Sequence, residues 1–158
     1  MNVLFVSPEV GPIVRVGGLG DVVGTLPIAL KKLGIDVRIL CPLHKVCKNL
    51  KTHSLPFQIN LNLGSKNFSV KFQETRLNNT DIPVYFLQNE ILFDRPGIYA
   101  DENGDYKDNP IRSFALSKAA LFLEKATEWK PDIFHSHDWM TAPACGFLNA
   151  KNGRYKSK

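Results

Sequence analysis

NVLFVSPEVGPIVRVGGLGDVVGTLPIALKKLGIDVRILC, residues 2–41, decides the fold because it contains two apolar runs with a helical pattern between them. Residues 2–7 and residues 36–41 each form a short apolar run ended by a proline, which predicts two buried parallel strands. Between them, apolar residues recur at helical spacing, at Leu19, Val22, Val23, Leu26, Leu30 and Leu33. A strand, a helix and a strand make a βαβ unit with a right-handed crossover. The expected fold class is therefore α/β, with a Rossmann-like, doubly wound, mainly parallel sheet.

The rest of the chain extends this pattern. Three alternating or apolar segments separated by turn signals predict a small antiparallel excursion from the sheet, at residues 53–64, 67–77 and 82–89. Residues 93–110 are rich in Gly, Pro, Asp and Asn and predict a long loop of the kind that often carries function. A helix over residues 110–127, a third parallel strand over 131–138 and a helix from about 139 to 150 are expected to follow. Because only three parallel strands are visible, the domain is expected to be incomplete.

Composition narrows the function classes. The chain has 158 residues, 44% of them hydrophobic, and a net charge of +5, which suits one globular domain. Its basic residues are scattered apart from a cluster in the last eight positions, so no nucleic-acid partner is expected. No stretch is long and apolar enough for a membrane span, and no leader precedes the first strand, so neither a membrane nor a secretory route is expected.

The three cysteines, Cys41, Cys47 and Cys145, suit a reducing compartment. Cys41, His44 and Cys47 could be drawn as a metal site, but no cysteine pair has the two-residue gap of the usual zinc sites. Neither a metal nor another cofactor is expected.

The glycine-rich stretch RVGGLGDVVG, residues 15–24, raises the question of a dinucleotide-binding fingerprint. That fingerprint needs its first glycine directly after the first strand and an acidic residue at the end of the second, and this chain has neither. Two readings remain open: an anion-binding loop at a helix N-terminus, or a tight turn before a capped helix. For the first reading, Gly17 and Gly18 permit backbone angles closed to other residues, and Arg15 adds a cation. Asp21, in the first helical turn, could cap the helix or accept a sugar hydroxyl.

Polar residues at the end of the third strand support a ligand site. Ligands of open α/β sheets bind outside the carboxyl ends of the strands. His137 and Asp138 should therefore face the same edge as the glycine-rich stretch, and we expect them to be functional. His135, one strand position further inside, is expected to be structural, and Trp139 is expected to pack rather than to stack on a sugar.

Three stretches together resemble the N-terminal domain of bacterial glycogen synthases and plant starch synthases. They are residues 1–42, residues 92–121 (LFDRPGIYADENGDYKDNPIRSFALSKAAL) and residues 131–142 (PDIFHSHDWMTA), and their order and spacing also match. The resemblance implies a two-domain GT-B glycosyltransferase that transfers glucose from ADP-glucose to the non-reducing end of an α-1,4-glucan. It further implies retention of configuration, no metal, and a bacterial cytoplasmic location.

The resemblance also implies roles for particular residues. The family's lysine-x-glycine-glycine-leucine signature, which reaches the donor diphosphate, reads here Arg15-Val16-Gly17-Gly18-Leu19. Arginine keeps the charge of the lysine but changes its geometry. The same matching makes Asp21 and Tyr99 substrate-binding residues. It makes Asp138, with the adjacent His137, the catalytic pair.

Residues 1–158 are thus expected to be a truncated N-terminal catalytic domain whose partner, a C-terminal nucleotide-binding domain, is absent from this sequence. By itself the fragment is expected to be inactive. The alternative function is a non-enzymatic glucan-binding or regulatory half derived from such an enzyme. A nicotinamide enzyme is disfavoured by the late glycines.

Overall fold

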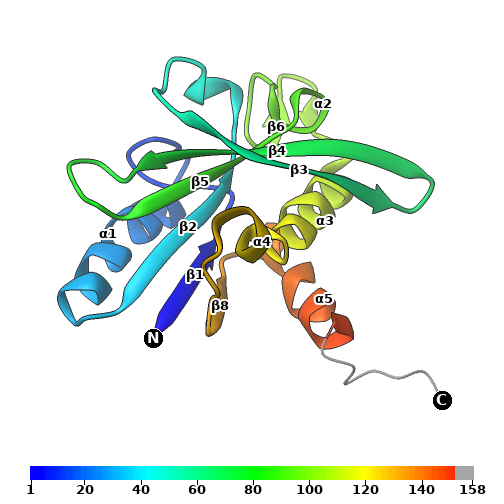
Figure 1. Ribbon diagram of the computed structural model, residues 1–158. Coiled ribbons are helices and arrows are strands. Elements are labelled where there is room, and N and C mark those ends of the chain that lie inside the picture. Colours follow the sequence, from blue (N-terminus) through cyan, green and yellow to red (C-terminus); the bar gives the residue numbers. More distant parts are fainter. Residues whose placement is uncertain (152–158) are drawn as a thin grey trace.

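The computed structural model describes residues 1–151, which form a six-stranded sheet with helices on both faces (Figure 1). The C-terminal basic residues Arg154, Lys156 and Lys158 lie outside the described part. In sheet order the strands are β3 (His53–Leu63), β4 (Lys66–Arg76), β5 (Pro83–Gln88), β2 (Asp36–Pro42), β1 (Asn2–Val6) and β8 (Ile133–Ser136). The helices are α1 (Gly18–Lys32), α2 (Glu90–Phe93), α3 (Asn109–Ala120), α4 (Leu123–Thr127) and α5 (Pro143–Lys151), with 3-10 turns η1 (Lys45–Cys47) and η2 (Trp139–Thr141).

The predicted α/β, mainly parallel fold is confirmed. β1 pairs in parallel with β2 and with β8, and β2 pairs in parallel with β5. The third segment of the predicted antiparallel excursion, β5, pairs antiparallel with β4 as expected and also adds a fourth parallel strand beside β2. β3 pairs antiparallel with β4, and the short strands β6 (Ala100–Asp101) and β7 (Gly104–Asp105) form a separate antiparallel pair. The β3–β4 hairpin replaces a crossover helix between β2 and β5, so the apolar run of β5 looked in sequence like the third strand of a meander.

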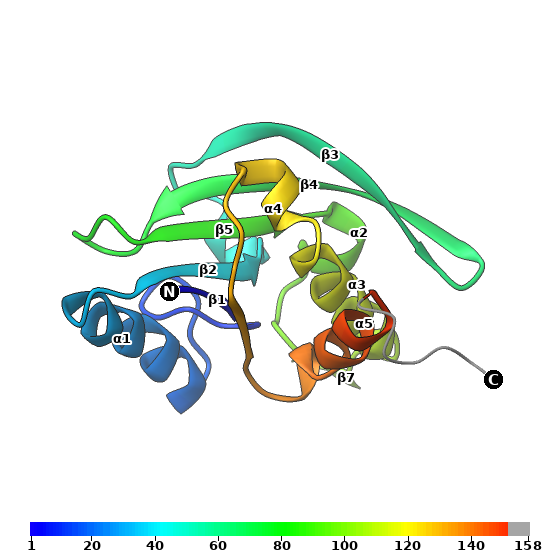
Figure 2. The same cartoon turned by 60° about the horizontal axis from the view of Figure 1, so that its bottom comes forward.

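The strands alternate their side chains between two cores. On one face, Leu4 and Leu40 pack in a cluster with Leu116 of α3. On the other face, Phe5 and Ile39 pack in a cluster with Val23 of α1 and other apolar residues. Figures 1 and 2 show α1 on one side of β1 and β2 and the helices α3 to α5 on the other. This is the doubly wound arrangement that leaves the carboxyl ends of the strands open to a ligand.

Two predicted helices differ in detail. The single helix expected over residues 110–127 divides into α3 and α4, and Glu128 in a left-handed conformation ends α4. Neither Gly nor Pro marks the division between Ala120 and Leu123, so the sequence carries no signal for it. The helix expected from about 139 begins as η2 and becomes α-helical only at Pro143. No helix within residues 1–151 combines the length and apolar character needed to cross a membrane.

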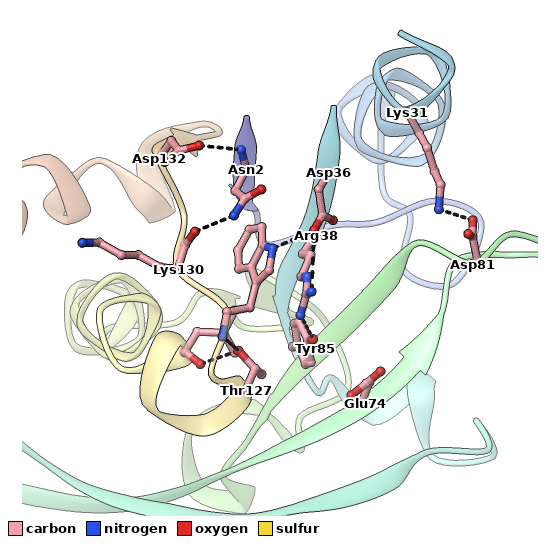
Figure 3. A network of polar contacts seen from close by, with 12 residues as sticks. Asn2, Lys31, Asp36, Arg38, Glu74, Asp81, Tyr85, Thr127, Lys130 and Asp132 are labelled. Carbon is pink, nitrogen blue, oxygen red and sulfur yellow. Dashed lines mark hydrogen bonds and ion pairs between the residues drawn. The ribbon is translucent and has the colours of Figure 1, made fainter. Parts of the chain in front are cut away.

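A polar network holds the amino ends of the central strands together (Figure 3). The backbone N–H of Asn2 donates to Asp132 at 2.8 Å, and the indole N–H of Trp129 donates to Asp36 at 2.7 Å. Arg38 stacks over the Trp129 ring at 4.4 Å and donates to the Tyr85 hydroxyl at 2.9 Å. The side chains at this edge therefore bind one another, whereas the opposite, carboxyl edge carries the predicted functional residues.

Candidate functional site

The predicted site lies where the strand order reverses. The chain leaves β1 through α1 toward β2 on one side, whereas β8 lies on the other side of β1. This reversal is the topological switch point at which open α/β sheets bind ligands. The segment after β1, the start of α1, the loop before α3 and the residues after β8 all meet there.

Glu9 is the central residue of this edge, although the sequence analysis gave it no role. Its side chain is buried, and one carboxylate oxygen accepts the N–H groups of Val16 at 2.7 Å and Gly17 at 3.2 Å. The other oxygen accepts the hydroxyl of Tyr99 at 2.7 Å. One carboxylate thus fixes the glycine-rich stretch and the 94–108 loop relative to each other. The available signal was a carboxylate two residues after the first strand, behind Ser7 and Pro8.

Tyr99 is fixed from its other side by the start of α3. Its carbonyl accepts the side-chain amide of Asn109 at 2.9 Å, and Asn109 in turn accepts a hydrogen bond from Arg112 at 2.6 Å. Arg112 is fully buried, which is rare for a cation. Its place on the apolar face of the predicted helix is the sequence feature that could have indicated this burial. Burial, together with the hydrogen bond to Glu9, raises the pKa of Tyr99 far above its usual value, so the phenol stays protonated.

The 94–108 loop is closed by a two-pronged ion pair. Arg95 donates to the two carboxylate oxygens of Asp108 at 2.7 and 2.6 Å, and it lies over the Tyr106 ring at 4.9 Å. The Tyr106 hydroxyl accepts the N–H of Gly97 at 3.1 Å. The hydrogen bond from Arg95 lowers the pKa of Asp108, so the pair is charged at neutral pH. The predicted long loop is therefore an ordered platform for Tyr99.

The glycines of the 15–24 stretch divide into two kinds. Gly17 is extended and caps α1, and Gly18 is its first helical residue, so neither uses the backbone angles that only glycine readily adopts. A Cβ atom at either position would meet nothing within 4 Å. By contrast, a Cβ at Gly24 would collide with the carbonyl oxygen of Gly11, which packs against the first turns of α1. Packing explains Gly24, whereas Gly17 and Gly18 leave open space in front of the helix N-terminus.

Arg15, Asp21 and Leu19 lie around that open space in different ways. The guanidinium of Arg15 pairs with the carboxylate of Asp21 at 2.9 Å, and both side chains are more than half exposed, at 60% and 53%. Such an exposed pair contributes at most about 1 kcal/mol, so a more strongly charged ligand can displace it. Leu19 is half-buried and packs against the core on the α1 face of the sheet, and its role toward a substrate stays a prediction.

The two histidines of β8 differ from the prediction. His137 is buried, with its ring 4.7 Å from Phe5 and 4.2 Å from the His135 ring, whereas His135, expected to be structural, is exposed. Both rings lie beside Phe5, His135 at 4.6 Å and His137 at 4.7 Å, so they share one face of the sheet. Burial, with a smaller contribution from His135, lowers the pKa of His137 to about 4, so this ring is neutral at pH 7. Its Nε2 atom has no hydrogen-bond partner within the described residues.

Asp138 is the exposed partner at the end of β8. Its backbone has φ of 65°, a left-handed conformation that is unusual for a residue with a side chain. Its carboxylate accepts the N–H of Trp139 at 2.6 Å and so caps η2. Trp139, expected to pack, is 47% exposed, with its ring 6.0 Å from that of Tyr99. Asp138 is thus held at the rim of the site, next to the exposed Trp139, whose ring lies beside the half-buried Tyr99.

The structure brings these predicted residues to one edge. Gly17 and Tyr99 share Glu9, and Tyr99 lies beside Trp139, which follows Asp138. Within residues 1–151, no group of three His, Cys, Asp or Glu side chains could hold a metal ion. The groups at this edge that could contact a ligand are a helix N-terminus, a cation and polar groups that can bind hydroxyls.

Comparison with known proteins gives a consistent picture. A family model described as "Starch synthase catalytic domain" matches residues 2–158. Glycogen synthase 1 of Geobacter sulfurreducens is 39% identical over 152 residues, which cover 94% of this chain and 30% of that protein. Glycogen synthase of Photobacterium profundum is 38% identical, with 89% and 28% covered. The chain therefore spans about 30% of the length of these relatives.

One solved structure has the same fold. The catalytic domain of starch synthase IV from Arabidopsis thaliana, bound to ADP and acarbose, superposes with a TM-score of 0.77 at 31% identity. The match covers 96% of this chain and 31% of that one.

Proposed function

Because this chain belongs to the starch synthase catalytic domain family, we propose that it forms the N-terminal part of a glucosyltransferase. The reaction we propose is transfer of glucose from ADP-glucose to the non-reducing end of an α-1,4-glucan, with retention of configuration and without a metal. The ADP bound to the Arabidopsis relative supports an adenine nucleotide sugar as donor. The bacterial origin of the glycogen synthases compared above supports a bacterial cytoplasmic location.

The observation that carries this proposal is the Glu9 bridge. Glu9 accepts the N–H groups of Val16 and Gly17 directly before α1, and a Cβ atom at Gly17 or Gly18 would meet nothing within 4 Å, so there is open space beside the start of the helix. The first N–H groups of a helix have no intrahelical partner and favour an anion. With Arg15 beside them, they form a cradle suited to a diphosphate.

This cradle suggests how the chain contributes to catalysis. Cleavage of the bond between glucose and phosphate leaves negative charge on the departing diphosphate, and preorganised donors that face this charge lower the barrier. Arg15 and the N-terminus of α1 would supply part of that stabilisation. Asp138 and the Tyr99 hydroxyl oxygen would orient sugar hydroxyls beside it. His137, being neutral and buried, would act by positioning Asp138 rather than as a cation.

We further propose that residues 1–158 do not transfer glucose by themselves. The candidate site is an open sheet edge, and its donors cover only one side of a ligand. The remaining protein walls would come from a separate nucleotide-binding domain.

Radiolabelled ADP-glucose tests both statements. A protein that contains this chain and a second domain should incorporate label into glycogen, and the 158-residue chain should not. Incorporation by the short chain would refute its proposed inactivity. Absence of incorporation by the longer protein, with intact glucan binding, would favour a non-enzymatic glucan-binding role instead.

A further inference from the structure

The strand β3 forms one edge of the sheet, and within residues 1–151 no strand pairs with its outer side (Figure 2). Residues 52–65, which include this strand, contain no Lys, Arg, Asp or Glu, and they are the longest such run in the chain. Edge strands usually carry a charge, a proline or a bulge that prevents pairing with another chain. In β3, Pro56 and a register shift between Ser54 and Gln58 protect only the first part. Residues 58–63 (QINLNL), called here the open edge, have no such protection.

The turn of the β3–β4 hairpin fixes which backbone groups of the open edge face outward. Its loop has two residues, with Gly64 in a left-handed conformation, so Leu63 and Lys66 close the hairpin as a hydrogen-bonded pair. Because such pairs alternate with non-hydrogen-bonded pairs, the N–H and C=O groups of the even-numbered residues point away from β4. These residues are Gln58, Asn60 and Asn62. One contact agrees with this direction, since the Lys118 ammonium donates to the Asn62 carbonyl at 2.7 Å.

The side chains of the open edge are sorted by chemistry onto two faces. The even-numbered residues carry exposed neutral amides. The odd-numbered residues are aliphatic and face the core, where Leu61 is buried but Ile59 and Leu63 are only half-buried. Since only even-numbered residues can exchange hydrogen bonds across this edge, an antiparallel copy of β3 would place amides opposite amides and aliphatic side chains opposite aliphatic ones.

These features fit a second copy of this chain as the partner. We propose that β3 pairs with β3 of a second copy in antiparallel orientation, centred on Asn60, which gives a homodimer with one continuous sheet. Gln58 then lies opposite the partner's Asn62, and Ile59 packs against the partner's Leu61, which removes apolar surface from water.

The charges near the open edge are compatible with this pairing. Opposite its even-numbered residues, β4 carries Lys71, Ser69 and Asn67, so Lys71 is the one charge in these rows. In the two-fold pairing, the two copies of Lys71 lie at opposite ends of the interface, because Lys71 is beside Gln58 and therefore in the same row as the partner's Asn67. No like charges face each other across the pairing, so nothing electrostatic opposes it.

The proposed interface lies away from the candidate site. Four strand spacings, roughly 19 Å, separate β3 from β1. The carboxyl ends of β1 and β8 therefore stay open in the dimer, and the proposal does not depend on the proposed function. A short strand pairing belongs to the small end of specific interfaces, which predicts a weak dimer with a dissociation constant of about 10–100 µM.

Sedimentation equilibrium of the 158-residue chain tests the proposal. Between about 5 and 500 µM, the average mass should rise from the 17.7 kDa of one chain toward twice that value. Asn60→Lys places two ammonium groups opposite each other at the centre of the pairing and should weaken the dimer at least about fivefold. The matched control Asn67→Lys adds the same charge on the same exposed face, one strand further in, and should dimerise like the parent.

Two further measurements report on the pairing itself. An equimolar mixture of Asn60→Lys and Asn60→Asp should dimerise more tightly than either variant alone, because opposite charges then face each other across the two-fold axis. Hydrogen exchange followed by amide NMR should slow at the N–H groups of Gln58, Asn60 and Asn62 as the parent concentration rises, because pairing protects them.

A parent chain that stays monomeric up to about 500 µM would overturn the proposal and leave the open edge to a strand of a different protein. Equal dimerisation by Asn60→Lys and the parent would also overturn it, as would a dimer whose three outward N–H groups exchange at the monomer's rate, since either result places the interface elsewhere. If circular dichroism shows that Asn60→Lys has lost its fold, hydrogen exchange of the parent decides the question.

Discussion

The carboxylate of Glu9 and the hydroxyl of Tyr99, which are 90 residues apart in the chain, share a hydrogen bond of 2.7 Å at the switch point of the sheet. The same carboxylate holds Val16 and Gly17, so the N-terminus of α1 and the Tyr99 loop have one common anchor. The geometry of the candidate site therefore depends on a residue that is itself buried.

Removing this anchor should destabilise the fold. Glu9→Ala leaves two backbone N–H groups and a phenol without their acceptor, and we expect a loss of about 2–4 kcal/mol in the free energy of unfolding, measured by urea denaturation. Glu9→Gln should cost less than about 1 kcal/mol, because its oxygen can accept the N–H groups while its amide donates to the Tyr99 oxygen. Equal losses for the two variants would show that side-chain volume, not hydrogen bonding, is responsible.

Two glycine substitutions should distinguish a glycine that close packing requires from a glycine that borders open space. Gly24→Ala places a methyl group against the Gly11 carbonyl and should lower stability by about 1–3 kcal/mol. Gly18→Ala meets no atom and gains helix propensity, so stability should stay the same or rise by up to about 1 kcal/mol. Thermal denaturation of both variants provides the comparison. A Gly18→Ala variant as unstable as Gly24→Ala would contradict the open space before α1.

Stability should fall in mild acid because of two buried histidines. Burial lowers the pKa values of His44 and His137 from the ordinary histidine value of 6.5 to about 4. The unfolded chain then binds protons that the folded chain does not, so stability is full above about pH 6.5 and decreases as the pH falls toward 4. Each histidine contributes up to about 3 kcal/mol to this decrease. Urea denaturation between pH 7 and pH 4 measures it, and imidazole NMR signals of the folded chain give the two pKa values. A His137 signal that titrates near pH 6.5 would refute the assignment.

Arg15 should matter for the rate of transfer in an active protein that contains this chain. If it stabilises the departing diphosphate, Arg15→Ala should lower kcat by about a hundredfold, and Arg15→Lys should retain most of the activity, since the charge remains. Lys32→Ala, at the far end of α1, is the matched control and should leave kcat unchanged. A change in KM alone for Arg15→Ala would mean that Arg15 binds substrate and transition state equally.

The sequence predicted the parts of the fold whose signals are local. The βαβ unit of residues 2–41 follows from two apolar runs and a helical stripe, and all three elements are present. β5 pairs antiparallel with β4 as expected, but its parallel pairing with β2 was not predicted, because β2 lies far away in the chain. His135 and His137 lie on one face of the sheet beside Phe5 yet differ in burial, and alternation within one segment cannot reveal such a difference.

The sequence predicted the location of the candidate site at the carboxyl edge of the sheet, but not the contacts that hold it together. Its residues were found because strand ends gather at one sheet edge. Glu9 and Arg112 were missed because their importance arises from contacts with distant partners rather than from a local pattern. The roles of Asp138 and Asp21 toward substrates stay predictions.

The order in which the chain leaves the ribosome determines when the hydrogen bond between Glu9 and Tyr99 can form. Glu9, Tyr99 and the side chains of Asn109 and Arg112 behind them are all present before β8 has been synthesised. Closing a contact over 90 residues is entropically costly and slow, so it needs the intervening sheet to bring its ends together. The nascent chain can therefore assemble β1 to β5, α3 and the Tyr99 loop as one folding unit, and β8 with Asp138 then docks onto a surface that is already formed.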